Sequence, residues 1–224
     1  MLQPVVLFDA VGTLIYPFPG AAQAYQVTAT KHGISVTETE LKQRFLAAFN
    51  DQFARSDLLY SVPSTEETER FKWNQVVRHV FQDSYTDELF ADLWNHFAAP
   101  ENWRCFDDAK PVIDGLIEMG FQIGIASNFD QRLKPIVSDT FPQLDSSMVF
   151  CSSEIEFAKP DVRFFKTIER DLKRKLDRVD PLMIGDHWKL DFDAASRAGW
   201  NALWKSGDNL PKLEVIQNQF LRSR

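Results

Sequence analysis

The sequence predicts an α/β protein in which a parallel sheet with helices on both faces is interrupted by an inserted helical domain. Residues 5–8 are a short apolar run, which is typical of a strand buried on both faces. From residue 100 onward, short apolar runs alternate with helical patterns, as expected for a parallel α/β sheet. Residues 16–99, between these two parts, show helical periodicity without a strand pattern. We therefore expect a core of residues 1–15 and 100–224 and an inserted domain of residues 16–99.

The first strand delivers an acidic residue to its carboxyl end. Residues 5–8 are followed at once by Asp9, and Gly12 stands shortly after it. Ligands of parallel sheets bind in the crevice beyond the carboxyl ends of the strands, and glycine lets the backbone pass close to a ligand. Asp9 is therefore placed to attack a substrate or to hold a metal ion, although an aspartate that only caps a turn fits this stretch equally well.

Amphipathic helices are expected throughout the inserted domain. Pro19 and Gly33 bracket the first helix. Residues 37–40 (Thr-Glu-Thr-Glu) and residues 64–67 (Ser-Thr-Glu-Glu) have the pattern of a capping box, and each precedes an apolar stripe at helical spacing. A fourth stripe lies within residues 89–97. Such helices bury their apolar faces against one another, which predicts a four-helix bundle whose aromatic stripes are core rather than the lining of a cofactor pocket.

The other strands of the sheet are expected in the second part of the chain. Short apolar runs occupy residues 121–126, 148–151, 182–184 and 201–204, and a helical pattern begins at Pro160. Strands that alternate with helices imply a parallel sheet with right-handed crossovers. The core is therefore expected to be one Rossmann-like domain.

The composition excludes several classes of function. Lys+Arg 25 against Asp+Glu 32 give a net charge of −7, so we expect no nucleic-acid-binding surface. No apolar run approaches the length of a membrane span, and the first residues lack the pattern of a secretory signal. Cys105 and Cys151 lack metal-ligand spacing. We expect a cytoplasmic protein with reduced thiols that binds neither nucleic acid nor a membrane.

Four segments of the core, taken in order, resemble the motifs of the haloacid dehalogenase-like hydrolase superfamily, in its subfamily I with a helical cap of the C1 type. Residues 5–14 resemble the first motif, in which a strand leads to an aspartate nucleophile. Ser127, with Asn128 beside it, resembles the second motif, in which a hydroxyl binds a phosphoryl oxygen. Lys159 resembles the lysine of the third motif, and residues 185–191 resemble the fourth, Gly-Asp followed after four residues by Asp.

The resemblance implies a role for each residue of these motifs. A carboxylate that attacks an anionic phosphoryl group needs positive charge beside it, and a lysine and Mg²⁺ would supply that charge. Each residue taken singly also fits a turn, a surface position or a helix cap, so their joint order carries the prediction. The implied nucleophile is Asp9; the implied phosphate ligands are Gly12, Ser127, Asn128 and Lys159; the implied Mg²⁺ ligands are Asp9, Asp186 and the carbonyl of Val11; orienting or acid–base roles are implied for Thr13, His187 and Asp191.

The sequence departs from the superfamily at Val11, where its phosphatases usually have a second aspartate. That aspartate protonates the leaving group and later activates water, and its loss is expected to cost about 10²- to 10⁴-fold in rate. Three explanations stay open: slow hydrolysis of esters with good leaving groups, a proton supplied by another group such as His187, or a protein that is not a phosphatase. Glu156 is a second departure, because the segment before Lys159 usually has glycine there.

Other members of the superfamily also lack the second aspartate. L-2-haloacid dehalogenases lack it and displace halide without a metal. In this chain, however, residues 185–186 keep the metal-binding form of the fourth motif. Phosphonate hydrolases need a Schiff-base lysine from the inserted domain, and nothing marks Lys31 or Lys42 as activated. The first motif, residues 20–25 and residues 71–77 resemble the subfamily named after a rhythmically expressed fly protein and a human hydrolase-domain-containing protein three, whose members commonly lack this aspartate.

These observations predict a hydrolase that acts on a small phosphorylated metabolite with Mg²⁺ and an aspartyl-phosphate intermediate. A cap that opens and closes would admit the substrate and exclude water. The alternative from another class is a catalytically impaired protein that binds a phosphorylated ligand or partner, and a 2-haloacid dehalogenase ranks below it. The chain is expected to be a monomer or a homodimer.

Overall fold

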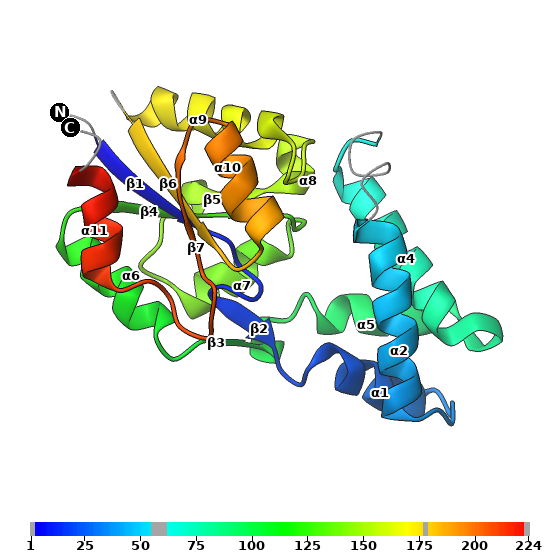
Figure 1. The fold of residues 1–224 in the computed structure, drawn as a ribbon. Coiled ribbons are helices and arrows are strands. Elements are labelled where there is room, and N and C mark those ends of the chain that lie inside the picture. The colour runs from blue at the N-terminus through cyan, green and yellow to red at the C-terminus, as the bar shows by residue number, and fades with distance from the viewer. Residues whose placement is uncertain (1–2, 55–61, 177–178, 222–224) are drawn as a thin grey trace.

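A computed structural model describes residues 3–54, 62–176 and 179–221 (Figure 1). Its centre is a five-stranded parallel sheet in the order β5-β4-β1-β6-β7, which confirms the predicted α/β fold class. The first strand of the chain therefore lies in the middle of the sheet, where both of its edges are paired. The strands are β1 (Gln3–Phe8), β4 (Gln122–Ser127), β5 (Val149–Cys151), β6 (Val179–Gly185) and β7 (Asn201–Trp204).

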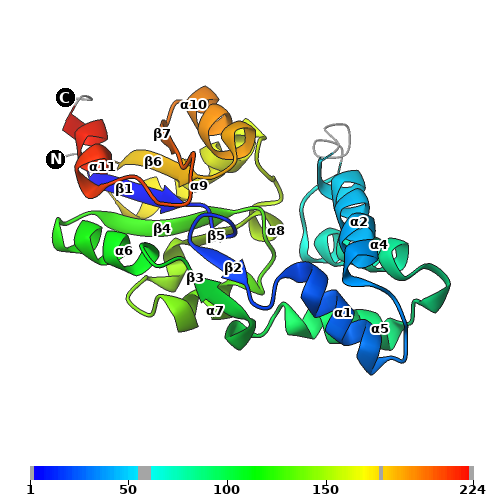
Figure 2. The ribbon, with the colours of Figure 1, turned by 60° about the horizontal axis from the view of Figure 1, so that its bottom comes forward.

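Helices cover both faces of the sheet, and the alternation of side chains along β1 shows why. Val6 and Phe8 pack into the apolar cluster on one face, and Val5 and Leu7 pack into the cluster on the other face. All four side chains are fully buried, as a central strand of this kind requires. One face carries α6 (Ala109–Glu118), α7 (Leu133–Thr140) and α11 (Leu213–Leu221), and the other carries α9 (Val162–Lys175) and α10 (Ala194–Arg197) (Figure 2).

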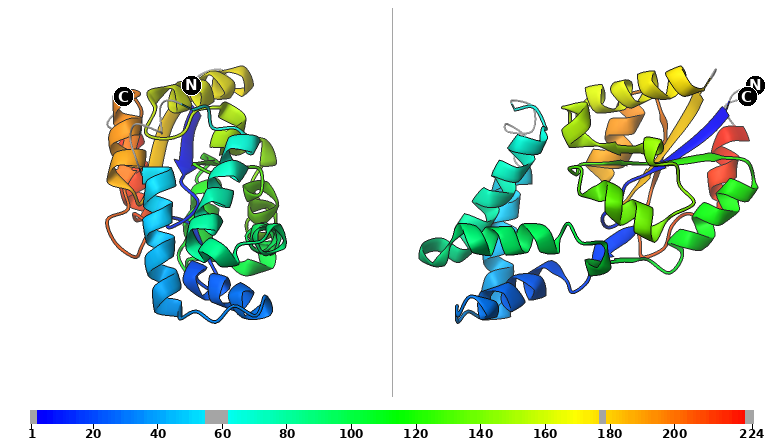
Figure 3. Two further views of the ribbon diagram at one scale, coloured as in Figure 1. Left: turned by 90° about the vertical axis from the view of Figure 1, so that its right-hand side faces the viewer. Right: turned by 180° about the vertical axis from the view of Figure 1, so that it is seen from behind.

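The helices between β2 and β3 gather on one side of this α/β unit (Figure 3). They enclose an apolar cluster of their own, in which Tyr25, Leu41 and Leu89 are almost completely buried. Each amphipathic helix buries its apolar stripe against the others, as the periodicity predicts. We call these helices the helical unit: α1 (Ala21–Lys31), α2 (Glu38–Phe49), α4 (Glu66–Phe81) and α5 (Asp87–His96).

The capping boxes differ from those predicted. Thr37 caps α2 by accepting a hydrogen bond from the backbone N–H of Glu40, but the return half of the box is absent, because the Glu40 carboxylate pairs with Arg44 instead. The helix α4 begins one residue later than Ser64 would place it. Thr65 is its N-cap and forms a reciprocal capping box with Thr68.

The two chain segments that join the helical unit to the sheet pair with each other. The strands β2 (Ile15–Pro17) and β3 (Trp103–Cys105) form a two-stranded antiparallel ribbon. Sequence analysis missed both strands because three residues are too short to show a period. Two further short elements were missed because they too show no clear period: α8 (Ser152–Ile155) and a π-helical turn at Trp188–Asp193. The longer helices α7 and α11 were also not predicted.

A polar seam fixes the start of α4 against the α/β unit. The hydroxyl of Ser64 donates a hydrogen bond to Glu69 at 2.9 Å, and its oxygen lies at hydrogen-bond distance, 3.0 Å, from the hydroxyl of Ser152. Its backbone N–H donates to the carbonyl of Glu156 at 3.1 Å.

In the described ranges, none of the helices has the length and apolar character that a membrane span requires.

Candidate active site

The carboxyl ends of three strands bring the residues of the four motifs together. Asp9 follows β1, Ser127 ends β4, and Asp186 follows β6. The ammonium of Lys159 lies among them: its Nζ is 2.7 Å from Oδ1 of Asp9 and 2.5 Å from Oδ1 of Asp191. Residues separated by up to 182 positions therefore meet at one edge of the sheet, as the parallel topology predicts.

Lys159 is a buried cation with three acceptors. Its side chain is 2% exposed, and Nζ donates to both carboxylates and to the carbonyl of Ala126 at 3.1 Å. Burial alone lowers the pKa of Lys159, but Asp191 and Asp9 together raise it above its ordinary value. The lysine is therefore charged at neutral pH and supplies fixed positive charge beside Asp9.

Asp9 is the carboxylate most affected by burial. Removal from water raises its pKa, Lys159 opposes the rise, and the negative charge of Asp191 adds to it. The hydroxyl of Ser127 lies near enough to lower the pKa of Asp9 by hydrogen bonding, and Ser127 is itself 3% exposed. A cation bound at these carboxylates would favour the ionised, nucleophilic form of Asp9.

Asp186 points outward and is held by the loop of the first motif. The hydroxyl of Thr13 accepts a hydrogen bond from the backbone N–H of Asp186 at 3.0 Å and donates one to its carboxylate at 3.1 Å. Gly12 has a φ of +88°, and a Cβ on it would lie 2.5 Å from the Asp186 carboxylate. Two features therefore require glycine at position 12: the positive φ of its backbone and the close approach of the Asp186 carboxylate to its Cα.

Asp191 reaches the site because of a π-helical turn and a second close approach. It lies in the turn Trp188–Asp193, and its carboxylate accepts a hydrogen bond from the backbone N–H of His187 at 3.0 Å. A Cβ on Gly185 would collide with this carboxylate at 2.2 Å. The other carboxylate oxygen of Asp191 accepts a hydrogen bond from Lys159. Asp191 therefore orients the lysine side chain.

Some of the implied ligands have other partners in the structure. Asn128 exchanges two hydrogen bonds with the backbone of Lys159, at 2.7 and 2.8 Å, so its amide positions the lysine. The backbone N–H of Gly12 donates to the carbonyl of Ile15 at 2.9 Å and is not directed at a ligand in this conformation. The ring of His187 accepts a hydrogen bond from the backbone N–H of Leu190 and caps the π-helical turn.

The two departures from the superfamily pattern, Val11 and Glu156, have different surroundings in the structure. The Val11 side chain is 37% exposed and lines a pocket that opens towards the helical unit. Glu156 has a φ of 66°, the left-handed conformation that explains a preference for glycine at this position. Its side chain is exposed, as expected for a carboxylate that points to water, and its carbonyl belongs to the polar seam.

The acidic residues fit a divalent cation. One carboxylate oxygen from each of Asp9, Asp186 and Asp191 lies within 4.8 Å of the others. Oxygen ligands with this much negative charge suit a hard cation such as Mg²⁺, which commonly takes one or two carboxylates with water and phosphate oxygens. Asp186 is exposed, whereas Asp9 and Asp191 are buried and both accept a hydrogen bond from Lys159.

Sequence analysis missed Lys205, which stands directly after β7 at the same edge of the sheet. It is 6% exposed, and its Nζ donates to the carbonyls of Gly12 and Gly207 at 3.2 and 3.0 Å. The preceding Trp204 donates from its indole to the carbonyl of Asp186 at 2.9 Å. The signal was available, because the rule that led to Asp9 and Ser127 applies to the end of every strand.

Comparison with known proteins identifies the class to which this arrangement belongs. Residues 4–199 match the family described as haloacid dehalogenase-like hydrolase, and the chain belongs to that family. The Rhythmically expressed gene 2 protein of Drosophila melanogaster is 33% identical over 216 residues, which cover 88% of this chain and 81% of that protein. Haloacid dehalogenase-like hydrolase domain-containing protein 3 of Mus musculus is 25% identical over 95% of this chain and 89% of its own length.

Solved structures share the fold at low sequence identity. The HAD-hydrolase YfnB from Bacillus subtilis, described as bound to magnesium, has a TM-score of 0.72 at 16% identity and covers 99% of this chain and 100% of its own. A defluorinating L-2-haloacid dehalogenase has a TM-score of 0.71 at 16% identity, with 97% and 94% covered. A HAD phosphatase from Thermococcus onnurineus has a TM-score of 0.63 at 19% identity, with 97% and 98% covered.

Proposed function

We propose that this hydrolase is a Mg²⁺-dependent phosphatase that acts on a small phosphorylated metabolite. The observation that carries the proposal is the cluster at the sheet edge, where Asp9 lies 2.7 Å from a buried lysine and beside two further carboxylates. A nucleophilic carboxylate, a fixed cation and oxygen ligands for a metal are the parts that phosphoryl transfer needs. Residues 16–99 would serve as a cap over this site and residues 1–15 and 100–224 as the core.

The proposed reaction has two steps at the carboxylate of Asp9. An Asp9 oxygen attacks the phosphorus atom, the bond from phosphorus to the ester oxygen breaks, and the leaving group departs with the bonding electrons. Water then attacks the phosphorus of the aspartyl-phosphate, the bond from phosphorus to the Asp9 oxygen breaks, and a proton of the water passes to the solvent, so that phosphate leaves and the Asp9 carboxylate is restored. Lys159 neutralises charge on the phosphoryl oxygens and on Asp9, and the Ser127 hydroxyl is placed to donate to a phosphoryl oxygen. Mg²⁺, held by Asp9, Asp186 and the Val11 carbonyl, would reduce the repulsion between the two anions.

The leaving group receives no proton from residue 11, since the side chain there is an alkyl group. The Nδ1 of His187 accepts a hydrogen bond from Leu190 N–H at 3.3 Å as part of a helix cap, so only its Nε2 is left to take part in proton transfer. Esters whose leaving group is stable as an anion are therefore the better substrates, and esters of alkyl alcohols the poorer ones.

The dehalogenase alternative fits this site less well. Solved structures of both kinds share the fold, so fold similarity does not choose between them. Asp186 supports the phosphatase proposal, because a displacement of halide by Asp9 has no use for an exposed carboxylate beside the nucleophile. A metal-binding pair of carboxylates favours phosphate.

The test is hydrolysis of 4-nitrophenyl phosphate by the purified protein with and without Mg²⁺. We expect turnover that requires Mg²⁺ and falls by at least about three orders of magnitude in Asp9→Asn. The control is Asp208→Asn, a change of an exposed aspartate outside the site, which should keep full activity. Absence of wild-type turnover, or turnover that persists in Asp9→Asn, would overturn the proposal. Binding of inorganic phosphate without turnover would then favour a protein that only binds a phosphorylated ligand.

A further inference from the structure

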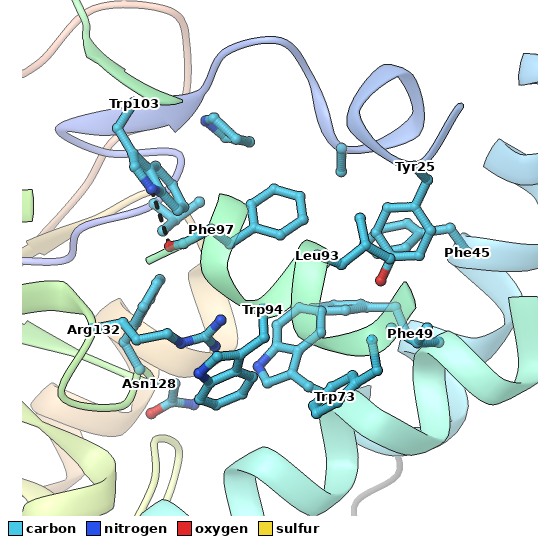
Figure 4. A pocket seen from close by; sticks show the side chains of 16 residues that line it. Tyr25, Phe45, Phe49, Trp73, Leu93, Trp94, Phe97, Trp103, Asn128 and Arg132 are labelled. Atoms are coloured by element: carbon cyan, nitrogen blue, oxygen red, sulfur yellow. Dashed lines mark hydrogen bonds between the residues drawn. The ribbon is translucent and has the colours of Figure 1, made fainter. Parts of the chain in front are cut away.

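A cavity of about 310 Å³ lies between the α/β unit and the helical unit (Figure 4). At one end it is lined by Val11 and Asn128, which flank Asp9 and Lys159. At the other end it is lined by Tyr25 of α1, Phe49 of α2 and further aromatic side chains of α4 and α5. A volume of this size suits a small molecule with one ring. The cavity therefore extends from the neighbourhood of the reacting carboxylate into the helical unit.

The lining is aromatic to a degree that the sequence did not predict. The stripes of α2, α4 and α5 had been expected to be core, and residues such as Leu93 are indeed buried there. Phe45, Phe49, Trp73 and Trp94, however, are only partly buried by their neighbours and face the cavity. Aromatic faces and edges of this kind pack well against another ring.

The cavity holds no free charge for an ionic substituent. Its only charged lining side chain among the described residues is Arg132. The guanidinium of Arg132 is already paired with the buried carboxylate of Asp130, at 2.6 and 2.7 Å, and lies 3.5 Å from the centre of the Trp94 ring. Its charge is thus balanced, and the guanidinium plane adds to the stacking surface.

One polar group at the far end of the cavity has no hydrogen-bond partner among the residues that the structure describes. Tyr25 is 1% exposed, and Figure 4 shows its hydroxyl directed into the space between the aromatic side chains. Within residues 3–54, 62–176 and 179–221, no group forms a hydrogen bond with this hydroxyl. Burial raises the pKa of Tyr25, so the group stays a neutral O–H. A hydroxyl that faces a cavity is otherwise hydrogen-bonded to water, and a ligand in the cavity would take the place of that partner.

We propose that this cavity receives the leaving group of the substrate, and that the substrate is an aryl phosphate whose ring carries a hydrogen-bonding substituent on the side remote from the phosphate. This inference rests on the proposed phosphatase function. The aromatic lining favours a substrate with an aromatic ring. Because the charge of Arg132 is already balanced, an uncharged ring is favoured. The Tyr25 hydroxyl favours a polar substituent on the side of the ring remote from the phosphate. Val11 points to the same class independently, because a phenolate departs without the proton that valine does not donate.

The first experiment compares phenyl phosphate with 4-(hydroxymethyl)phenyl phosphate, whose phenols have closely similar acidity. We expect the hydroxymethyl group to raise kcat/KM of the wild type by about three- to tenfold, the value of one net hydrogen bond. The advantage should disappear in Tyr25→Phe. It should persist in Tyr85→Phe, a matched loss of a tyrosine hydroxyl that in this protein binds Asn74 and Asp87 outside the cavity. Equal kcat/KM for the two esters in the wild type, or an equal advantage in Tyr25→Phe, would overturn the proposal.

A second experiment separates this proposal from the phosphatase function. Binding of the product 4-(hydroxymethyl)phenol is followed by calorimetry and by tryptophan fluorescence, neither of which needs turnover. We expect saturable binding to the wild type that is about three- to tenfold weaker in Tyr25→Phe and unchanged in Tyr85→Phe. Binding of this phenol without hydrolysis of any phosphate ester would support the cavity assignment and refute the phosphatase. Hydrolysis of phosphate esters without binding of the phenol would support the phosphatase and refute the cavity assignment.

Discussion

The charged cluster at the sheet edge and the aromatic cavity beside it follow opposite physical rules. In the cluster, Lys159 is bound by Asp9, Asp191 and a carbonyl, so each group is fixed by several others. In the cavity, contacts are apolar and the one buried hydroxyl, on Tyr25, has no protein partner in the described ranges. The cluster is therefore complete in the absence of an organic ligand, whereas the cavity is completed by one.

This difference separates reaction chemistry from selection of the substrate. Groups that stabilise charge must be preorganised, since their value depends on fixed orientation in a site with little water. Apolar packing is not directional and tolerates exchange of one side chain for another of similar volume. Val11 belongs to both regions, because it stands in the loop of Asp9 and its side chain lines the cavity.

The largest effect is expected when the cluster loses its cation. Lys159→Met leaves two buried carboxylates facing each other, so we expect hydrolysis to fall to background and the free energy of unfolding to drop by about 3–5 kcal/mol. Urea unfolding and 4-nitrophenyl phosphate kinetics measure both. Lys189→Met, in an exposed lysine of the neighbouring turn, is the control and should change neither. A stable, active Lys159→Met protein would show that the cluster is not interdependent.

The same variant should acquire a new pH dependence. Burial raises the pKa of Asp9 above its ordinary value of 3.8, and Lys159 opposes that rise. Without the lysine the folded-state pKa lies further above the unfolded value, so the folded state binds the proton more tightly. The stability deficit relative to the wild type should then grow as pH rises from the folded-state pKa of Asp9 in the wild type to that in the variant, and stay constant above it. Urea unfolding at pH 5 and at pH 8 tests the sign, and a deficit that is larger at pH 5 would contradict it.

The next effect comes from the residue that the two regions share. Val11→Asp introduces the missing acid, and we expect kcat/KM for an alkyl ester such as 2-phenylethyl phosphate to rise by about 10²- to 10⁴-fold. The gain should be smaller for aryl esters, since their leaving groups need no proton. Val11→Asn has nearly the same shape without an acidic proton and should give no gain. An equal gain for both classes of ester would mean that Val11 limits something other than proton transfer.

The sequence predicted the cluster far better than the cavity, and the reason is physical. Asp9, Ser127 and Asp186 follow from one rule, because strand ends of a parallel sheet meet at one edge. The cavity depends on which apolar side chains of different helices fail to touch, and helical period alone does not reveal that. Trp73 shows this limit, because it packs against the core of the helical unit, as its spacing predicts, and also lines the cavity. The ribbon β2–β3 and the π-helical turn around Asp191 depend on tertiary pairing, which no local pattern shows.

A smaller effect is expected from Lys205, which supports the cluster from outside. Its ammonium holds the carbonyl of Gly12, and Gly12 packs against the Asp186 carboxylate. Lys205→Met should loosen this loop and lower kcat/KM by about tenfold, with a loss of about 1–3 kcal/mol in unfolding free energy. Because Lys205 acts through the loop, the concentration of Mg²⁺ needed for half-maximal activity should rise as well. The exposed Lys212→Met is the control, and an unchanged Mg²⁺ requirement in Lys205→Met would refute the positioning role.

The smallest effect concerns a second polar contact between the start of α4 and the α/β unit. Glu66 at the start of α4 accepts hydrogen bonds from the backbone N–H of Gln131, at 2.9 Å, and from the hydroxyl of Ser153. Glu66→Ala removes both, so we expect a loss of about 1 kcal/mol in unfolding free energy and a rise of about two- to fivefold in KM with little change in kcat. The matched control is Glu67→Ala, an exposed glutamate in the same turn, with the same charge and the same position relative to the helix dipole. If the two variants raise KM equally, the effect comes from the lost charge at the start of the helix. The hydrogen bonds of Glu66 then do not position the helical unit relative to the charged cluster.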